Sequence, residues 1–411
     1  MTNVNRNVSV QIGLHTTTSD FSTMPSVTPV LPRANVPTLL SRQRTGIPRP
    51  LRSTTGLRFA KVRGEKAIDG ISLPLDFRGV NANTGAAVAA WEAKMEQGAL
   101  LASLFGAVGA ATTGVATTCS GTAAATLTVA AGTDIPTGSV ILFTTSTGTF
   151  IRRVTAGGGT TTLTLNQAAS GTASGTVIRL GRWTGLPAVN HHQHVAVDWE
   201  QLSESVGVAR RQYVGCAPSK GVITIPNNGL LMFDVDLMPT DWSRVAVASP
   251  AFVQPTAGEA IATNAVEFRI GANVFDLRNA KFTVDNQIAM RETLSGPNGV
   301  RGGVAGAGGD EGKIFMLEGE ILVGAAVPGQ ELQDNTGTPS VRELLGDTDS
   351  KGAVVTARDL MLTVGSVAGS CMGIFMPTAD MDCTLVESGP FQVLKFTAYG
   401  TGATPAVLAV G

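Results

Sequence analysis

The sequence predicts a mainly β protein with one principal helix, built as a β-sandwich or barrel with long hairpins and a small inserted β module. Among the 411 residues, Gly occurs 49 times, whereas only 15% are charged and 5% are aromatic. Thr, Ser, Ala and Val fill much of the remainder, and this composition favours strands and turns over helices. Short alternations of apolar and polar residues also recur between clusters of Gly, Pro and Asn, which is the pattern of strands joined by turns.

The length and the shifts in composition divide the chain into an arm and three further regions. A chain of 411 residues predicts two or three domains. A joint rich in Pro and Ala, Ala248 to Gly258, predicts a domain boundary. The expected regions are an extended N-terminal arm at 1–56, a first domain at 57–110 and 184–250, an inserted small β domain at 111–183, and a second domain at 251–411.

The arm is rich in Pro, Ser, Thr and Asn. Six prolines between residues 25 and 50 exclude a regular helix or a central strand there, so an ordered arm must lie along another surface. Between Arg33 and Lys66, nine basic residues accompany one acid, whereas residues 67–411 carry 20 basic and 29 acidic residues. A basic arm on an acidic body is typical of nucleic-acid binding or of docking on an acidic neighbour of the same kind, although it also fits a solvated segment without a partner.

After the arm, alternating residues predict strands at Leu57–Val62 and Ile71–Arg78. The next stretch predicts the principal helix, from a cap at Thr84 to a stop at Gly106, with Gly98 weakening its middle. The residues expected on its core-facing side are Val88, Trp91, Met95, Leu101, Leu104 and Phe105. An amphipathic helix that follows two strands packs most simply across a sheet.

The inserted module has a different composition, because short strands alternate with turns of Gly, Ser and Pro. This spacing predicts a small sandwich or barrel. Its expected strands are Leu127–Val129, Val140–Thr144, Phe150–Val154, Thr161–Leu165 and Val177–Leu180.

The segment from Gln212 to Trp242 predicts a hairpin, because two alternating runs flank the turn signal at Pro226–Gly229. Side chains on a strand alternate between its two faces. Leu231, Phe233, Val235 and Leu237 therefore fall on one face, and Met232, Asp234, Asp236 and Met238 fall on the other. One face needs a core, and the carboxylates of Asp234 and Asp236 face water or a pore.

The remaining chain predicts further strands and a second hairpin around Glu387–Pro390, which suggests a duplication of the first. Between two of these strands, Gly296–Gly309 is rich enough in glycine to predict a flexible loop. The expected strands are Val266–Ile270, Asn279–Asn286, Ile314–Leu322, Ala357–Val364, Cys371–Pro377 and Phe391–Tyr399.

Motifs for chemistry are weak. The four cysteines are widely spaced and form no CxxC pair, and the His-rich run Asn190–His194 beside Asp198 is better explained as polar side chains at a module boundary than as a metal site. Neither a phosphate-binding GxxxxGK[ST] motif nor a GxSxG elbow is present. We therefore predict no enzyme, no cofactor and no metal. Without a signal peptide or a spanning apolar stretch, we expect assembly in a cytoplasm and no membrane contact.

The order of these elements resembles the tail tube proteins of long-tailed bacteriophages, and most closely the larger ones of non-contractile, siphovirus-type tails. The resemblance covers residues 57–290 and, more loosely, 310–411. Its carriers are the Leu-Leu…Phe-Gly ending at Gly106 and Gly215-Cys216 leading into the long hairpin.

The resemblance implies a structural virion protein whose sheets join between copies into a multi-subunit β-barrel around a lumen, with rings stacked into a conduit for double-stranded DNA. Asp234 and Asp236 are the lumen-facing candidates. The candidates for contacts between stacked rings are Arg42, Arg44, Arg49, Arg52, Gly302 and Gly303. A true duplication implies trimeric, pseudo-hexameric rings, and a single tube fold implies hexamers. The implied partners are other copies and tail proteins such as the tape measure and tail terminator. The alternative is a capsid decoration or other virion surface protein.

Overall fold

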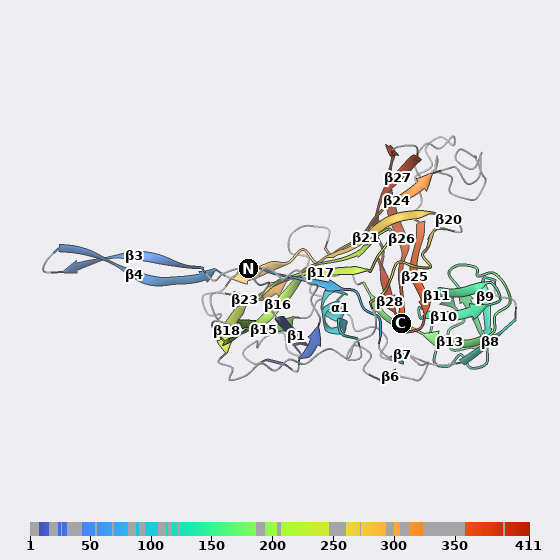
Figure 1. Cartoon of the computed structure of the whole chain (residues 1–411), viewed down its shortest axis with the longest axis horizontal. Helices are drawn as coiled ribbons and strands as arrows, with labels where there is room; N and C mark the ends of the chain where they lie inside the picture. The colour runs from blue at the N-terminus through green and yellow to red at the C-terminus, as the bar shows by residue number, and fades with distance from the viewer. Residues whose placement is uncertain are drawn as a thin grey trace.

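The computed structural model confirms the mainly β class, with α1 (Gly98–Phe105) as the one helix among the described residues. Most strands belong to one 16-stranded antiparallel sheet, and a smaller set closes into a barrel (Figure 1). No helix in the described part of the chain has the length and apolar character needed to cross a bilayer. The described residues are 8–15, 24–25, 27–30, 43–53, 56–67, 70–80, 88–89, 95–105, 112–113, 117–121, 124–185, 194–203, 207–245, 260–271, 273–292, 300–304, 312–323, 358–388 and 391–411.

The large sheet runs β2-β1-β15-β16-β21-β24-β27-β26-β25-β19-β20, with β5, β17, β18, β14 and β28 attached beside this path. Its strands are β1 (Val8–Leu14), β2 (Thr28–Val30), β5 (Ile71–Asp76), β14 (Gly181–Thr184), β15 (Val195–Ser203), β16 (Gly207–Ile225), β17 (Met232–Met238), β18 (Asp241–Val245), β19 (Glu267–Ile270), β20 (Asn273–Phe275), β21 (Leu277–Asp285), β24 (Ile314–Val323), β25 (Arg358–Val367), β26 (Ser370–Ser388), β27 (Phe391–Gly400) and β28 (Val407–Val410). Strands of both predicted domains thus lie in one sheet, while the expected joint at Ala248–Gly258 lies outside the described residues.

The strand β16 changes neighbours along its length. Its first half pairs with β15 and β18, and its second half pairs with β17 and β21. The change occurs near Gly215, which has φ +58° beside an irregularity in the β15–β16 register. Gly adopts this conformation without the steric cost that a Cβ would impose, so the strand can bulge and turn there. The Gly-Cys pair singled out in the sequence therefore marks a bend into the long hairpin.

The hairpin of β16 and β17 is confirmed, with Ile223 opposite Phe233 and Gly221 opposite Val235. We call the part of the sheet that runs β5-β17-β16-β21-β24-β27-β26 the central sheet. α1 packs on its buried face, where the ring of Phe105 lies 6.3 Å from that of Phe282. A Cβ at Gly221 would collide with Leu104 Cδ1, so this glycine lets the helix approach the sheet.

The helix is shorter than the sequence pattern predicts. Val88–Ala89 forms strand β6, which pairs with β7 (Thr112–Thr113), so the pairing overrides the helical spacing there. α1 begins only at Gly98, the residue expected to weaken its middle, and a glycine inside a helix costs conformational entropy. Thr84, Trp91 and Gly106 lie outside the described residues.

The barrel closes in the order β10-β11-β12-β9-β8-β13, and it lies within the predicted inserted module. All five strands expected there are confirmed, while β8 escaped prediction because its four residues are mostly Thr and Ser. The strands are β8 (Thr117–Ser120), β9 (Thr126–Val129), β10 (Val140–Thr145), β11 (Gly148–Ala156), β12 (Thr162–Leu165) and β13 (Gly175–Arg179). The barrel has its own core, in which Leu127, Phe143 and Leu163 are buried.

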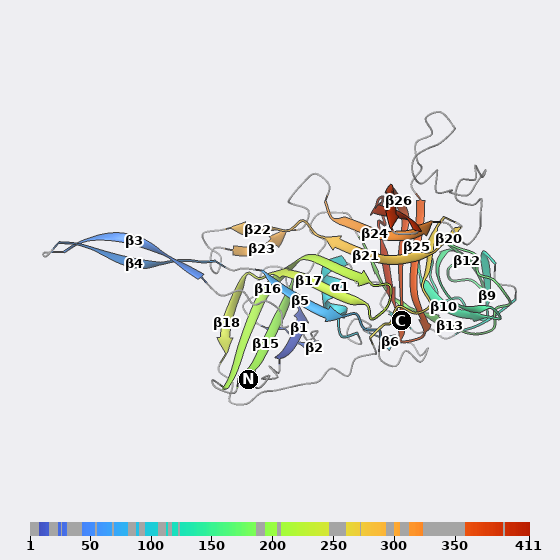
Figure 2. The same ribbon diagram turned by 45° about the horizontal axis from the view of Figure 1, so that its top comes forward.

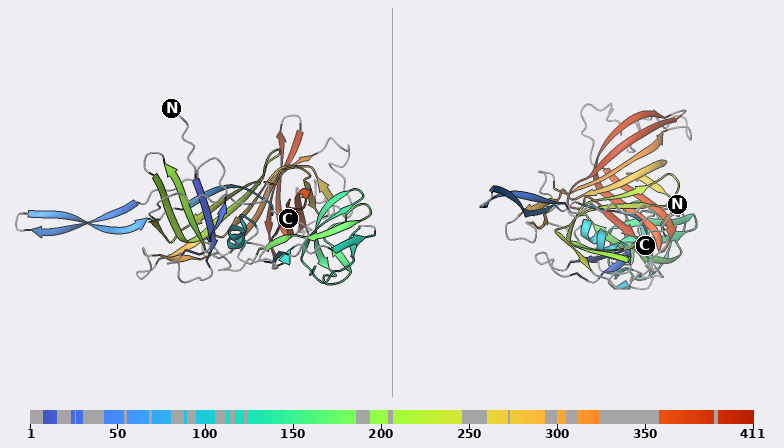
Figure 3. Two further views of the ribbon diagram at one scale, coloured as in Figure 1. Left: turned by 60° about the horizontal axis from the view of Figure 1, so that its bottom comes forward. Right: turned by 60° about the vertical axis from the view of Figure 1, so that its left-hand side comes forward.

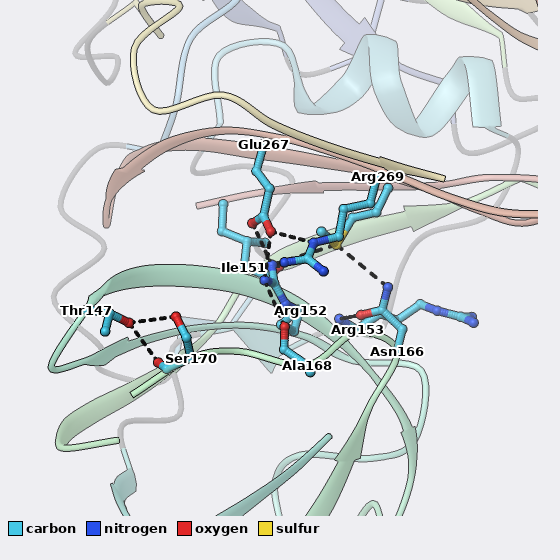
Figure 4. A network of polar contacts seen from close by, with 10 residues as sticks. Thr147, Ile151, Arg152, Arg153, Asn166, Ala168, Ser170, Glu267 and Arg269 are labelled. Carbon is cyan, nitrogen blue, oxygen red and sulfur yellow. Dashed lines mark hydrogen bonds and ion pairs between the residues drawn. The ribbon is translucent and has the colours of Figure 1, made fainter. Parts of the chain in front are cut away.

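Polar contacts and an apolar cluster join the barrel to the large sheet. Arg152 on β11 is fully buried and makes a two-pronged ion pair with Glu267 of β19, at 2.9 and 3.0 Å (Figure 4). Arg269 donates to the same carboxylate at 2.6 Å. Beside them, Ile151 of the barrel and Phe375 of β26 share an apolar cluster. The barrel is therefore fixed on the sheet by buried contacts.

The arm, which the sequence predicts to be extended, contains strands in its described part. β1 inserts between β2 and β15, and Val10 and Ile12 on it are buried. Backbone pairing with β15 orders this segment along another part of the chain. Further on, β3 (Gln43–Ser53) and β4 (Gly56–Ala67) form a separate two-stranded ribbon. The ribbon projects along the long axis, at the opposite end from the barrel (Figure 1, Figure 3).

The glycine-rich segment expected to be a flexible loop also contains a strand. β23 (Val300–Val304) pairs with β22 (Ala289–Glu292), and Gly303 lies opposite Met290 (Figure 2). Backbone hydrogen bonds of an antiparallel pair need no side chains, so glycine content alone did not exclude pairing. The flanking residues 293–299 and 305–311 lie outside the described part of the chain.

Candidate functional site

Asp234 and Asp236, the two carboxylates predicted to face a pore, lie on the same face of β17. Asp234 is half-buried and Asp236 is exposed, whereas Val235 between them and Phe233 before them are buried. The predicted alternation of this strand is therefore confirmed. The carboxylates lie on the face opposite α1, and the strand is held in the sheet by β16 on one side and β5 on the other.

The register extends this polar face across the whole central sheet, because residues directly opposite on paired strands share a face. One row consists of Asp76, Met232, Thr224, Lys281, Glu318, Thr397 and Asp382. The next row consists of Pro74, Asp234, Val222, Thr283, Met316, Tyr399 and Asp380. Strands lie about 4.8 Å apart, so from β5 to β26 the face is roughly 30 Å wide.

The opposite face is apolar along the same strands. The corresponding buried row consists of Leu75, Phe233, Ile223, Phe282, Leu317 and Ala398. From β5 to β27, the central sheet thus has one packed side and one polar side. Such a division is expected of an antiparallel sheet that separates a core from water.

Carboxylates outnumber lysines on the polar face. The carboxylates on the paired rows are Asp76, Asp234, Asp236, Asp285, Glu318, Glu320, Asp380 and Asp382, and the lysines are Lys220, Lys281 and Lys395. Two of the lysines lie near glutamates, with Lys281 Nζ 3.6 Å from Glu318 Oε2 and Lys395 Nζ 3.6 Å from Glu320 Oε1. Asp236, Asp380 and Asp382 are exposed, so the surface of this face is acidic.

Sequence reasoning found one of the three acidic pairs on this face. Asp380 and Asp382 on β26 have the same spacing as Asp234 and Asp236, and Glu318 and Glu320 repeat it on β24. The sequence pattern that marks such a pair is two acidic residues at alternate positions of one strand. It was missed at Asp380 because the strand was expected to stop at Pro377, whereas β26 continues through that proline to Ser388.

The residues predicted for contacts between rings lie in two separate elements. Arg44, Arg49 and Arg52 lie on β3 of the ribbon, and Arg42 is outside the described residues. Gly302 and Gly303 lie on β23. Both elements are two-stranded and separate from the central sheet, so these residues are not part of its acidic face.

Of the His-rich run, only His194 lies within the described residues. His194 is buried, and its carbonyl oxygen accepts a hydrogen bond of 2.9 Å from the His15 N–H. Asp198 accepts from Arg210 Nε at 2.8 Å, which engages the nearby carboxylate. Across the described residues, no group of three or more His, Cys, Asp or Glu side chains is placed to hold a metal ion.

The four cysteines are free thiols. Burial raises the pKa of Cys371 to about 12 and that of Cys383 to about 11, with nearby Asp382 adding to the effect at Cys383. A thiol with a raised pKa is a poor nucleophile, because the thiolate is the reactive form. Cys371 lies in the apolar cluster between the barrel and the large sheet, and Cys383 packs against the main core.

No protein-family model matches the chain, and no curated protein matches it either. The acidic face and the edges of the central sheet are therefore the features from which a function is inferred.

Proposed function

We propose that this chain is a structural, non-catalytic virion protein that forms stacked rings in the tail tube of a long-tailed bacteriophage. In this role the central sheets of neighbouring copies form the wall of a lumen, and their acidic faces line it. DNA passes through the lumen without specific binding, and the protein is assembled in the host cytoplasm before it becomes part of the virion. Its partners are further copies of the chain and other tail proteins.

The observation that carries this proposal is the acidic face that spans the central sheet opposite its packed side. Carboxylates repel the phosphates of DNA, so a surface with excess acids lets the polyanion slide past instead of adhering. One end of the same sheet supports assembly as well, because in the described part of the chain the distal part of β26, Asp380–Ser388, has an unpaired edge, and a contact between copies removes unpaired backbone groups. The similarity of element order to tail tube proteins adds a second line of support.

Electron microscopy of the purified protein tests the assembly. We expect rings or tubes with a central lumen, and class averages down the tube axis distinguish three copies per ring from six. Persistent monomers that bind only to capsids would contradict the tube and favour a decoration protein.

The role of the acidic face is tested by replacing Asp234 and Asp236 with Lys together. We expect tubes to assemble while infectivity falls by about tenfold or more, since the four added units of positive charge attract the DNA backbone. Wild-type infectivity of virions that carry this variant would contradict a lumenal position. A control with the same charge change places lysines on exposed barrel positions, namely Thr118, Ser120, Thr126 and Thr128.

A further inference from the structure

The two ends of the central sheet are formed by β5 and by the distal part of β26, Asp380–Ser388. Within the described part of the chain, no strand pairs with the outer edge of either segment. An unpaired strand edge offers a row of N–H and C=O groups to an incoming strand. The two edges differ in how many of these backbone groups are available for pairing.

The edge of β5 is blocked. The Phe77 N–H donates to the Leu231 carbonyl at 2.9 Å, so alternate residues of β5 face β17 and the residues between them face outward. Pro74 is one of the outward residues and has no N–H to donate. The outward carbonyl of Asp76 already accepts a hydrogen bond from the Gln97 side chain. This edge is therefore poorly suited to adding a strand.

The distal edge of β26 is open. The Thr401 N–H donates to the Thr378 carbonyl at 2.9 Å, and the same register continues without a bulge to Ser388. The backbone groups of Met381, Cys383 and Leu385 therefore face away from β27. No proline interrupts residues 380–388. Leu385 and Val386 are 39% and 36% exposed on opposite faces of the strand, so apolar surface on both sides also lacks cover.

The ribbon supplies a strand of complementary charge. β4 carries Arg58, Lys61, Arg63 and Lys66 against the single acid Glu65, whereas the β26 edge carries the exposed Asp380 and Asp382. β4 contains no proline, and at twelve residues it is long enough to cover this edge.

Of the two outer edges of the ribbon, only that of β3 is blocked against pairing with a further strand. In β3, Pro48 and Pro50 lie opposite Lys61 and Phe59. Because the two prolines are two residues apart, their backbone nitrogens face the same side of the strand. An antiparallel pair accommodates proline where this nitrogen faces away from the partner strand. The outer edge of β3 is therefore poor in donors, and the β4 edge remains for pairing. The ribbon projects away from the body and from its own β26, so it does not meet the β26 edge of the same copy (Figure 1, Figure 2).

We propose that the β4 edge of one copy adds as a strand to the distal β26 edge, Asp380–Ser388, of a second copy. The positive charge of the β4 sequence then complements Asp380 and Asp382, and the exposed Leu385 and Val386 are covered. The proposed ring assembly is needed only to place this contact between stacked rings in the tube. As a contact between two copies it is measured in solution, whether or not tubes form.

Two charge-reversal variants test the contact. One carries Asp380→Lys and Asp382→Lys, and the other carries Arg58→Glu and Arg63→Glu. In each variant alone, the β4 strand and the β26 edge that it meets carry charges of the same sign. We therefore expect self-association in sedimentation equilibrium to weaken by about tenfold or more. In an equimolar mixture, opposite charges meet at contacts between the two different variants, whereas contacts between identical variants still bring like charges together. Association of the mixture should therefore recover well above that of either variant alone. Failure of the mixture to recover would overturn the pairing of these two elements.

A backbone variant tests strand addition separately from charge. Leu385→Pro removes an N–H that faces outward, so the β26–β27 ladder keeps its own hydrogen bonds, and Leu385→Ala controls for the lost side chain. We expect association to fall well below that of Leu385→Ala, with circular dichroism and melting temperature used to verify folding. Association of both variants at the same strength would contradict strand addition. Association without tubes in the microscope would contradict the tube and leave this contact standing, whereas a strictly monomeric wild-type protein would overturn the contact itself.

Discussion

The barrel and the central sheet are both antiparallel β structures, but the barrel is closed and the central sheet is open. Every strand of the barrel has a partner on each side, and the barrel surrounds a core of its own. The central sheet ends at β5 and at the distal part of β26, and only one of its faces is packed. Closure satisfies backbone groups within one copy, whereas an open sheet leaves them for a neighbour. Within its described part, the same chain thus contains one module in which every strand is paired on both sides and another that ends in an unpaired strand edge.

The two regions meet at a buried charge cluster. Burial alone would raise the pKa of Glu267, but hydrogen bonds and charge from Arg152 and Arg269 outweigh it and hold the pKa below its usual value. Burial lowers the pKa of Arg152, which the Glu267 carboxylate partly offsets. The ion pair therefore offsets part of the desolvation penalty of each group.

The largest effect is expected for Glu267→Ala, which leaves Arg152 buried beside the sheet without this carboxylate. Removing one partner of a buried ion pair costs about 3–5 kcal/mol of unfolding free energy, because the remaining charge is still desolvated. Urea denaturation measures the loss. A loss below about 1 kcal/mol would mean that the barrel is not fixed through this pair.

The matched control is Glu318→Ala on the polar face. Glu318 also lies near a cation, Lys281, but both side chains are substantially exposed. Exposed ion pairs contribute roughly 0–1 kcal/mol, so this variant should be nearly as stable as the wild type.

A second prediction separates the closed module from the open one. Leu163 is fully buried in the barrel core, and Leu163→Ala should cost about 2–5 kcal/mol through lost packing and the cavity that remains. Because the barrel has no open edge, self-association measured by sedimentation equilibrium at a temperature where the variant is folded should be unchanged. Loss of association with this variant would show that the barrel takes part in the contact between copies. Leu163→Met, of similar volume, serves as the control.

The sequence predicted what depends on local pattern. The alternation around Phe233 placed Asp234 and Asp236 on the polar face, and turn residues marked the strands of the barrel. Helical spacing at Val88 failed, because pairing with Thr113 depends on a segment distant in sequence. The width of the acidic face depends on register, which joins Asp234 to Asp380 through strands that local pattern cannot order.

The smallest predicted effect concerns Lys313, which is buried beside α1 and donates to the Leu104 carbonyl at 3.3 Å. Burial lowers its pKa from 10.5 to about 7, so between these values the unfolded chain binds a proton that the folded protein does not. The penalty for burying the charge is complete below about pH 7 and is relieved as the pH rises, by at most about 1.4 kcal/mol per pH unit.

The difference in unfolding free energy between wild type and Lys313→Met isolates this group, because the raised thiol pKa values affect both proteins equally. From pH 7 to 8.5 the wild type should gain stability relative to Lys313→Met, whose lost hydrogen bond adds an offset that does not vary with pH. Parallel stability curves for the two proteins would mean that Lys313 stays charged in the folded state. Lys313 would then be a buried cation whose charge is stabilised by its surroundings, as that of Arg152 is by Glu267. The difference between the barrel contact and the rest of the sheet would then be smaller.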